Sequence, residues 1–354
     1  MIRILTALLL LSALACQAQQ AQLLVLLKQH RVPGLQLVHA RGKSQQRYAL
    51  GLRRAGDRPP VDASTVFQAA SLSKVVLAYA ALRLHDRGLL DLDRPLQEYY
   101  ANPRLQAEPR AARITARMVL THRAGLPNWA ANPLSAQWAG SALQLKVAPD
   151  SCWNYSGEGF VLLQRVLEQL SGQSWQALAQ AEVFGPLAMV RSSFVWQPWF
   201  ALDASCGHDA QGQPTEVKQF AAPNGAFSLM TTATDYSRFL QAVLRGEGLQ
   251  PATAQLLRTP ATAANRCGTP PSPADAHISW ACGVGLVSTS RGPALWHWGD
   301  NGDFKNFFVA FPDRQESVVF FTNGANGLQL TDDILRLLLG PGEYWTSQWL
   351  AAGQ

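Results

Sequence analysis

Ser71-Leu72-Ser73-Lys74 is the stretch that decides how this sequence is interpreted. A serine and a lysine three positions apart at the start of a helix lie on the same face, so Lys74 comes within reach of the Ser71 hydroxyl. A serine hydroxyl needs a neighbouring base to become a good nucleophile, and a desolvated lysine can lose its own proton and serve as that base. The pair therefore predicts a route to an acyl-enzyme on Ser71.

A chance pairing of serine and lysine is the alternative, and the surrounding sequence argues against it. The chain has six lysines, and only Lys74 has a serine three residues before it. The motif also opens a run with helical apolar periodicity, from Val75 to Leu84, with Gly88 as its stop signal. We therefore interpret the pair as catalytic.

Length and charge narrow the class of protein. The chain has 354 residues and no Gly/Ser-rich, Pro-rich or charged linker, which predicts one compact unit with two lobes. The formal net charge of +6 comes mostly from scattered arginines without a basic cluster, which disfavours a nucleic-acid partner. A mildly positive field would suit a small-molecule or peptide substrate that carries a carboxylate.

The first residues have the pattern of an export signal, which we place at 1–18. Arg3 supplies a positive start, and the apolar run Ile4 to Leu14 is too short to span a membrane. Ala13-Leu14-Ala15 fits a signal cleavage site, while Ala15-Cys16 also resembles the end of a bacterial lipoprotein signal. We expect a periplasmic or secreted protein, or a lipoprotein tethered to the membrane through a lipidated Cys16.

The cysteines beyond Cys16 form an even set, as expected in an oxidising compartment: Cys152, Cys206, Cys267 and Cys282. Four cysteines allow three complete pairings, and the sequence alone does not choose among them. A Cys206–Cys267 bridge is favoured weakly, since these two flank a segment with few hydrophobic runs. Buried free thiols remain the alternative.

The order of the predicted elements indicates an α+β fold. Residues 35–40 and 46–50 alternate like a hairpin, after a short helix over 23–29. The middle of the chain is helical or irregular, with predicted helices over 115–122, 158–170, 175–181 and 231–244. Strands return over 281–289, 294–297, 306–311 and 317–322, and a helix over 332–339 follows them. We expect a single domain over 19–354: an antiparallel sheet built from both chain ends, flanked by helices, with a mainly helical lobe inserted at about 90–200.

Other chemical groups lie in two further segments. Tyr155, in Asn154-Tyr155-Ser156-Gly157, precedes a predicted helix and could pass a proton between Ser71 and a leaving group if Lys74 lowers its pKa; alternatively, it is a packed aromatic. In Trp296-His297-Trp298-Gly299-Asp300, Gly299 permits close approach of the backbone to a substrate.

If that second segment lies on an edge strand beside the serine, the backbone N–H groups of Ser71 and Asp300 could form an oxyanion hole. His297 would then be a hydrogen-bonding or charge-bearing wall of the pocket. We interpret the remaining histidines as structural, and His122 as the residue at a helix end.

Rival patterns of nucleophile and cofactor are missing from the sequence. It contains no Gly-x-Ser-x-Gly elbow, phosphate-binding loop, Rossmann glycine pattern or His-Glu-x-x-His helix. The sequence therefore predicts neither a cofactor nor a metal site.

Taken together, these motifs resemble the serine β-lactamase and penicillin-binding protein superfamily, in its branch of class C β-lactamases, D-alanyl-D-alanine carboxypeptidases and esterases. The resemblance follows the chain in order. It implies that Ser71 is the nucleophile, that Lys74 is its base, and that Tyr155 is the tyrosine of a Tyr-x-Asn motif. His297-Trp298-Gly299 is similar to the family's third motif, Lys/His-Thr/Ser-Gly, on the strand that lines the site.

Three departures from the family pattern bear on the substrate. Gly157 stands where the family has an asparagine that helps to hold the substrate's acylamino side chain. Trp298 replaces a small hydroxyl residue, and His297 resembles certain carboxypeptidases and esterases more than class C β-lactamases. We expect an exported serine hydrolase that cleaves an amide or ester bond, with D-amino-acid peptides or β-lactams as candidate substrates. The alternatives are a carboxylesterase for small esters and a catalytically weak receptor for penicillin or cell-wall peptide.

Overall fold

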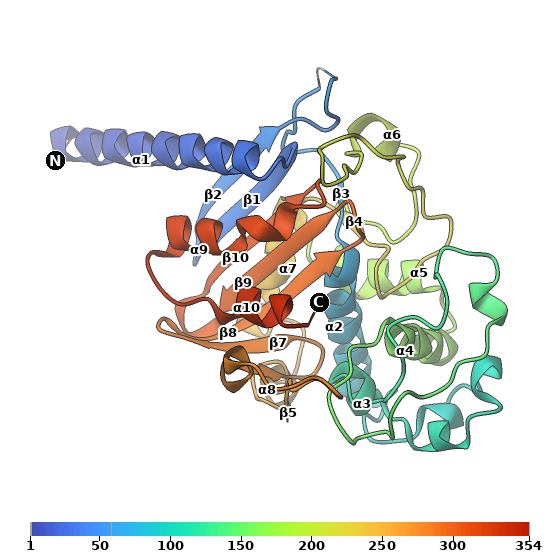
Figure 1. Ribbon diagram of the computed structural model, residues 1–354. Helices are drawn as coiled ribbons and strands as arrows, with labels where there is room; N and C mark the ends of the chain where they lie inside the picture. The colour runs from blue at the N-terminus through green and yellow to red at the C-terminus, as the bar shows by residue number, and fades with distance from the viewer. Residues whose placement is uncertain (1, 58, 354) are drawn as a thin grey trace.

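The computed structural model describes the backbone of residues 2–57 and 59–353 (Figure 1). The expected export signal begins at Met1, which lies outside the described residues. The helices are α1 (Ile2–Gln29), α2 (Ser73–Asp86), α3 (Ala116–Leu120), α4 (Gly157–Ser171), α5 (Trp175–Ala179), α6 (Phe200–Asp203), α7 (Ala233–Arg245), α8 (Pro251–Leu256), α9 (Thr331–Leu339) and α10 (Trp345–Ala351). The strands are β1 (Gly34–Arg41), β2 (Ser44–Gly51), β3 (Phe67–Gln68), β4 (Met230–Thr231), β5 (Thr262–Ala263), β6 (Ile278–Trp280), β7 (Gly285–Thr289), β8 (Gly292–Asp300), β9 (Lys305–Phe311) and β10 (Glu316–Thr322).

One antiparallel sheet of eight strands forms the centre of the molecule, in the order β2-β1-β10-β9-β8-β7-β6-β5. The N-terminal hairpin β1–β2 pairs with the last strand, β10, so the two ends of the chain complete the sheet. A separate pair, β3 and β4, joins the segment before Ser71 to the segment before α7. The predicted α+β fold, with an antiparallel sheet made from both chain ends, is confirmed.

The middle of the sheet is buried on both faces, as β10 shows. All seven of its residues are buried, and its four consecutive apolar residues, 318–321, alternate between two hydrophobic clusters. Val318 and Phe320 face the side that α1, α9 and α10 cover, whereas Val319 and Phe321 face the side of α2 and α7 (Figure 1). Because side chains alternate along a strand, a strand buried on both faces becomes a continuous apolar run.

The helical lobe lies beside the sheet and contains α3, α4 and α5 (Figure 1). Its helices begin at capping residues: Thr115, Ser156 and Ser174 each accept a hydrogen bond from a backbone N–H of the first turn. Helix α2 runs between this lobe and the sheet and is buried along almost its whole length. Its first turn is therefore placed where the two parts of the fold meet.

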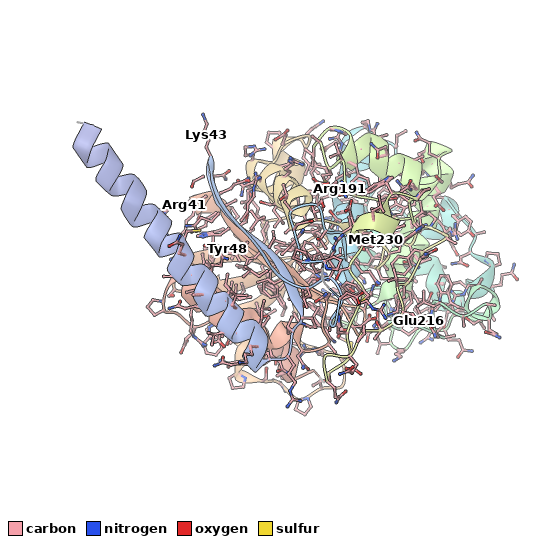
Figure 2. All side chains as sticks on the ribbon, turned by 90° about the horizontal axis from the view of Figure 1, so that it is seen from above. Arg41, Lys43, Tyr48, Arg191, Glu216 and Met230 are labelled. Carbon is pink, nitrogen blue, oxygen red and sulfur yellow. A yellow bond between two sulfur atoms is a disulfide. The ribbon has the colours of Figure 1, made fainter. Side chains whose placement is uncertain are left out.

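Helix α1 is longer than the sequence predicted, because the expected signal and the helix over 23–29 form one continuous helix. Its second half lies on the sheet: Leu23 and Leu27 are buried, and the Tyr48 hydroxyl of β2 donates to Oε1 of Gln19 at 2.7 Å. Figure 2 shows the other half projecting beyond the sheet, away from Tyr48. Among the described residues, none of the helices combines the length and apolar character needed to cross a membrane.

The predicted disulfide between Cys206 and Cys267 is wrong. Cys267 is bonded to Cys152, with 5.6 Å between the two Cα atoms. Cys206 is instead a buried thiol with its Sγ 3.7 Å from Nε2 of His208. The observed bridge ties the loop before α4 to the segment that follows β5, a proximity that depends on the tertiary fold and not on the local sequence.

Candidate active site

Ser71 lies in a short 3₁₀ turn, Ala70–Leu72, that leads directly into α2. Ala70 has φ +50°, a left-handed conformation that costs energy for a residue with a side chain. The turn is nevertheless fixed, because Leu229 holds it with two hydrogen bonds: its carbonyl accepts from Ala69 N at 2.7 Å, and its N–H donates to Ser73 Oγ at 3.1 Å. Strain of this kind, maintained by surrounding structure, is characteristic of functional sites.

Lys74 is fully buried and reaches back to Ser71. Its Nζ donates to Ser71 Oγ at 3.1 Å and to the carbonyl oxygen of Ala226 at 2.9 Å. Among the described residues no carboxylate forms an ion pair with it; its other neighbours are the rings of Tyr155 and Phe160, at 4.9 and 5.7 Å from Nζ. Because burial disfavours the charged amine, the pKa of Lys74 is lowered to about 7. A large fraction of Lys74 is then neutral near pH 7 and able to accept a proton.

Tyr155 lies in the loop that enters α4, and the structure brings it next to Lys74. Its hydroxyl oxygen is buried and makes no hydrogen bond to the part of the chain that the structure describes. Burial raises the pKa of Tyr155 well above its ordinary value, and the neighbouring Ser71 opposes this only in part. The direction is opposite to the one expected from the sequence, because the effect of burial on the phenol dominates. Tyr155 is thus a protonated phenol at neutral pH.

The segment 297–300 of β8 lies along the serine turn. β8 is an interior strand of the sheet and not an edge strand, but its pairing with β7 ends at Trp296, so beyond that point it pairs with β9 alone. This locally free edge faces the turn. A Cβ atom on Gly299 would lie only 2.5 Å from the Ala69 carbonyl oxygen, so the close approach requires glycine.

His297 differs from its expected role. It is completely buried, and because a carbonyl only accepts, its Nδ1–H donates to the Trp298 carbonyl at 2.7 Å. Burial, together with the charge of Lys74, lowers the pKa of His297 to about 3. The histidine is neutral at physiological pH, so the suggestion of a charge-bearing wall is wrong. Trp298, packed on Tyr155 with 4.9 Å between ring centroids, is partly exposed instead.

Comparisons with known proteins agree with this arrangement. A family model described as Beta-lactamase matches residues 15–340. The chain belongs to the Beta-lactamase family. It is 24% identical to penicillin-binding protein 4 of Amycolatopsis lactamdurans over 331 residues, 88% of this chain and 86% of that one. It is 29% identical to esterase EstB of Burkholderia gladioli over 277 residues, 64% of this chain and 69% of that one.

The fold matches solved structures over nearly the whole chain. A class C β-lactamase superposes with a TM-score of 0.77 at 17% sequence identity, covering 92% of this chain and 95% of the other. The suggested resemblance to the serine β-lactamase and penicillin-binding protein superfamily is confirmed, and with it the assignment to a superfamily of serine hydrolases. Because these relatives include a penicillin-binding protein, an esterase and a β-lactamase, the reaction of this family member has to be inferred from its own site.

The structure gives a steric reason for glycine at position 157 that the sequence did not reveal. It is the first residue of α4, and a Cβ atom placed on it would overlap the indole ring of Trp129. That ring also packs edge-on against Phe227, with 5.6 Å between centroids. In this family member, an aromatic side chain therefore fills the space beside the position where the family pattern has asparagine.

Glu158 holds the loop that carries Trp129. Its buried carboxylate receives two hydrogen bonds from the Arg104 guanidinium at 2.7 and 2.9 Å, one from Trp138 Nε1 at 2.8 Å and one from Ala130 N at 3.0 Å. Sequence reasoning missed Arg104 and Trp129, because they lie in irregular segments without a periodic pattern, and it missed the role of Glu158 within α4. An ionisable residue directly after Gly157, inside an apolar helix, was the available signal.

His122 was also missed as a residue of the site. The sequence suggested a helix end, and His122 does lie just beyond the C-cap of α3, but it is fully buried with its ring 4.4 Å from that of Tyr155. Among the described residues, no group of three His, Cys, Asp or Glu side chains is arranged to hold a metal ion.

The contact between Gly157 and Trp129 leads to a stability prediction. Gly157→Ala should lower the free energy of unfolding by about 1–3 kcal/mol, because the added methyl group forces the indole out of its place. In a Trp129→Ala background the same substitution should cost almost nothing. Urea denaturation of the two single variants and the double variant measures the coupling.

Gly159→Ala is the matched control in the same helical turn. Its Cβ would come no closer than 3.3 Å to another side chain. An equal loss of stability for Gly157→Ala with and without the Trp129 ring would contradict the steric explanation.

Proposed function

We propose that this protein is an exported serine hydrolase that cleaves an ester or amide through an acyl-Ser71 intermediate. The observation that carries the proposal is the hydrogen bond between the buried Lys74, which has no counter-ion among the described residues, and the Ser71 hydroxyl at the head of α2. A stability role alone does not account for this pair, since burying an unpaired amine costs free energy. A base with a pKa near the working pH is what general-base catalysis requires.

The proposed reaction proceeds in two halves. Neutral Lys74 takes the proton of Ser71 as Oγ attacks the substrate carbonyl carbon, and the carbonyl oxygen becomes an oxyanion near the backbone N–H groups of Ser71 and Asp300. Tyr155 donates its proton to the leaving alcohol or amine as the bond to the carbonyl carbon breaks, and it regains a proton from Lys74. Water then attacks the acyl-enzyme and releases the acid and Ser71.

An uncharged ester has better support than a β-lactam or a D-amino-acid peptide. The Trp129 ring fills the space beside position 157, and Gly157 has no side-chain amide to hold an acylamino group. A substrate carboxylate, as the basic net charge suggested, would need a free cation, but His297 is neutral. The lysines at this end of the sheet are paired, Lys305 with Asp300 at 2.6 Å and Lys218 with Asp303 at 2.8 Å.

The D-amino-acid peptidase or β-lactamase remains the second candidate function. Its support is the similarity to penicillin-binding protein 4 over 88% of the chain. A receptor that binds such ligands without turnover is the third. It would have little use for a lysine base and a buried tyrosine beside the same serine.

Acylation of Ser71 is the first consequence to test. After exposure to p-nitrophenyl butyrate or to a penicillin, intact-protein mass spectrometry should show an acyl adduct that Ser71→Ala abolishes. Ser135→Ala, at a partly exposed serine that is hydrogen-bonded to the backbone of Asn132, is the control that should still be acylated. An adduct that survives in Ser71→Ala would refute Ser71 as the nucleophile.

The two reagents also separate the candidate functions. Rapid turnover of the ester without a penicillin adduct supports the esterase. A long-lived penicillin adduct supports a penicillin-binding peptidase, and turnover of the drug supports a β-lactamase.

The pH dependence of the activity should follow the protonation of Lys74. Because protonated Lys74 cannot accept the Ser71 proton, kcat/KM for an uncharged ester should rise with pH and level off above about 7, falling about tenfold per pH unit below it. His122 and His297 have pKa values lowered far below this range, so neither should add a limb near neutrality. A profile from pH 5 to 9 that is flat, or that falls as pH rises towards 7, would contradict the assignment of Lys74 as the base.

The proposal also states that the protein is exported from the cytoplasm. It is supported by the signal-like residues 1–18 and by the Cys152–Cys267 disulfide, since such bonds persist in oxidising compartments. We expect the protein in the periplasmic or membrane fraction of its host, with the disulfide formed. Intact mass would distinguish a lipidated from an unmodified Cys16, and a full-length reduced protein in the cytoplasm would contradict export.

A further inference from the structure

Among the described residues, no group forms a hydrogen bond that fixes the Tyr155 hydroxyl, so the position of the phenol depends on the loop and on ring packing. His122 contacts that loop at three consecutive residues. The His122 carbonyl accepts from Asn154 N at 2.7 Å, its Nδ1 accepts from Ser156 N at 3.1 Å, and its ring lies on the Tyr155 ring at 4.4 Å and 35°. The backbone of His122 is in the left-handed region, φ +57°, which turns both groups towards the same loop.

The chemical state of His122 is fixed by these contacts. A backbone N–H only donates, so Nδ1 must be unprotonated and the ring proton resides on Nε2. Burial, with the nearby charges of Lys74 and His297, holds the pKa of His122 well below its ordinary value, which keeps the ring neutral. Its Nε2 is buried without a partner among the described residues. An unpaired buried donor is unfavourable, so the stability of the protein gives no reason to prefer histidine here.

We propose that His122 is the positioning residue for Tyr155: it holds the loop on both sides of the tyrosine and packs on its ring, and so sets the phenol in reach of Ser71. This inference rests on the proposed function, in which Tyr155 transfers a proton. The position requires a flat ring and a hydrogen-bond acceptor at once, and a neutral histidine supplies both. His122 touches neither the reacting atoms nor Lys74 through a hydrogen bond, so it acts through Tyr155.

Two variants separate the contributions of His122. His122→Phe keeps a ring on Tyr155 but loses the acceptor for Ser156 N–H, whereas His122→Asn keeps an acceptor near the place of Nδ1 but loses the ring. Tyr155→Phe and the double variant His122→Phe/Tyr155→Phe complete a double-mutant cycle. His277→Asn is the control for loss of a stacked histidine, since His277 lies on Trp345, near the C-terminal end of the chain, with 4.0 Å between ring centroids.

The measurements are kcat and KM for p-nitrophenyl butyrate, with thermal unfolding of every variant. Misplacing a catalytic group by about 1 Å can cost roughly 100-fold in rate, so we expect His122→Phe to lower kcat by about 10- to 100-fold with little change in KM. In the Tyr155→Phe background the same substitution should change kcat less than about twofold. His122→Asn should retain more activity than His122→Phe if the acceptor dominates, and less if the ring dominates.

The outcomes distinguish the positioning role of His122 from the proton-transfer role of Tyr155. Equal losses from His122→Phe with and without the Tyr155 hydroxyl would overturn the inference, and so would folded His122→Phe and His122→Asn proteins with normal kcat. If His122→Phe fails to fold, the cycle built with His122→Asn decides in the same way. Full activity of Tyr155→Phe would instead refute the proposed role of Tyr155 and leave Ser71 and Lys74 to be judged by the acylation experiment.

Discussion

The burial of Lys74 beside Ser71 is the interaction on which the rest of this site depends. An amine removed from water without a carboxylate partner lowers its own pKa, and this lowering is what makes it a base near pH 7. The surroundings supply two hydrogen-bond acceptors and aromatic rings, and no compensating charge. A carboxylate in the same place would stabilise the charged amine and raise its pKa, so the absence of an ion pair at Lys74, among the residues described, is a condition for the proposed role of Lys74 as a base.

Burial of Lys74 depends on segments that are distant in the sequence and that the fold brings together around the first turn of α2. The first turn of α2 has the helical lobe on one side and the sheet on the other, and each contributes a wall. The loop with Tyr155 comes from the lobe, while Gly299 of β8 comes from the sheet and lies so close to the turn that a Cβ atom would not fit. Leu229, just before β4, fixes the turn itself. The desolvation of Lys74 is thus a property of the whole assembly, and truncating either part would expose the amine to water.

Most of the fold and the centre of the site could be predicted from the sequence. Short elements and contacts between distant segments could not. The periodic segments were found: the predicted strand over 317–322 is β10, and the predicted helix over 158–170 is α4. Short or irregular elements such as β3 and β5 carry too few residues for a pattern. The disulfide partner of Cys267 and the contact between Gly157 and Trp129 depend on segments that only the tertiary fold brings together.

The charge of the site could not be predicted from residue types, and this bears most on the substrate. A histidine in the third motif and a basic chain suggested a positive pocket, but His122 and His297 are both buried and held neutral, partly by Lys74. Asp300 stands at the open end of β8, where its carboxylate is partly exposed and paired with Lys305. A site of this composition offers aromatic surface and hydrogen bonds to a substrate, but little net charge. The proposed preference for an uncharged acyl group rests on this lack of free charge, because the groups that could attract a carboxylate are neutral, as His297 is, or paired, as Lys305 and Lys218 are.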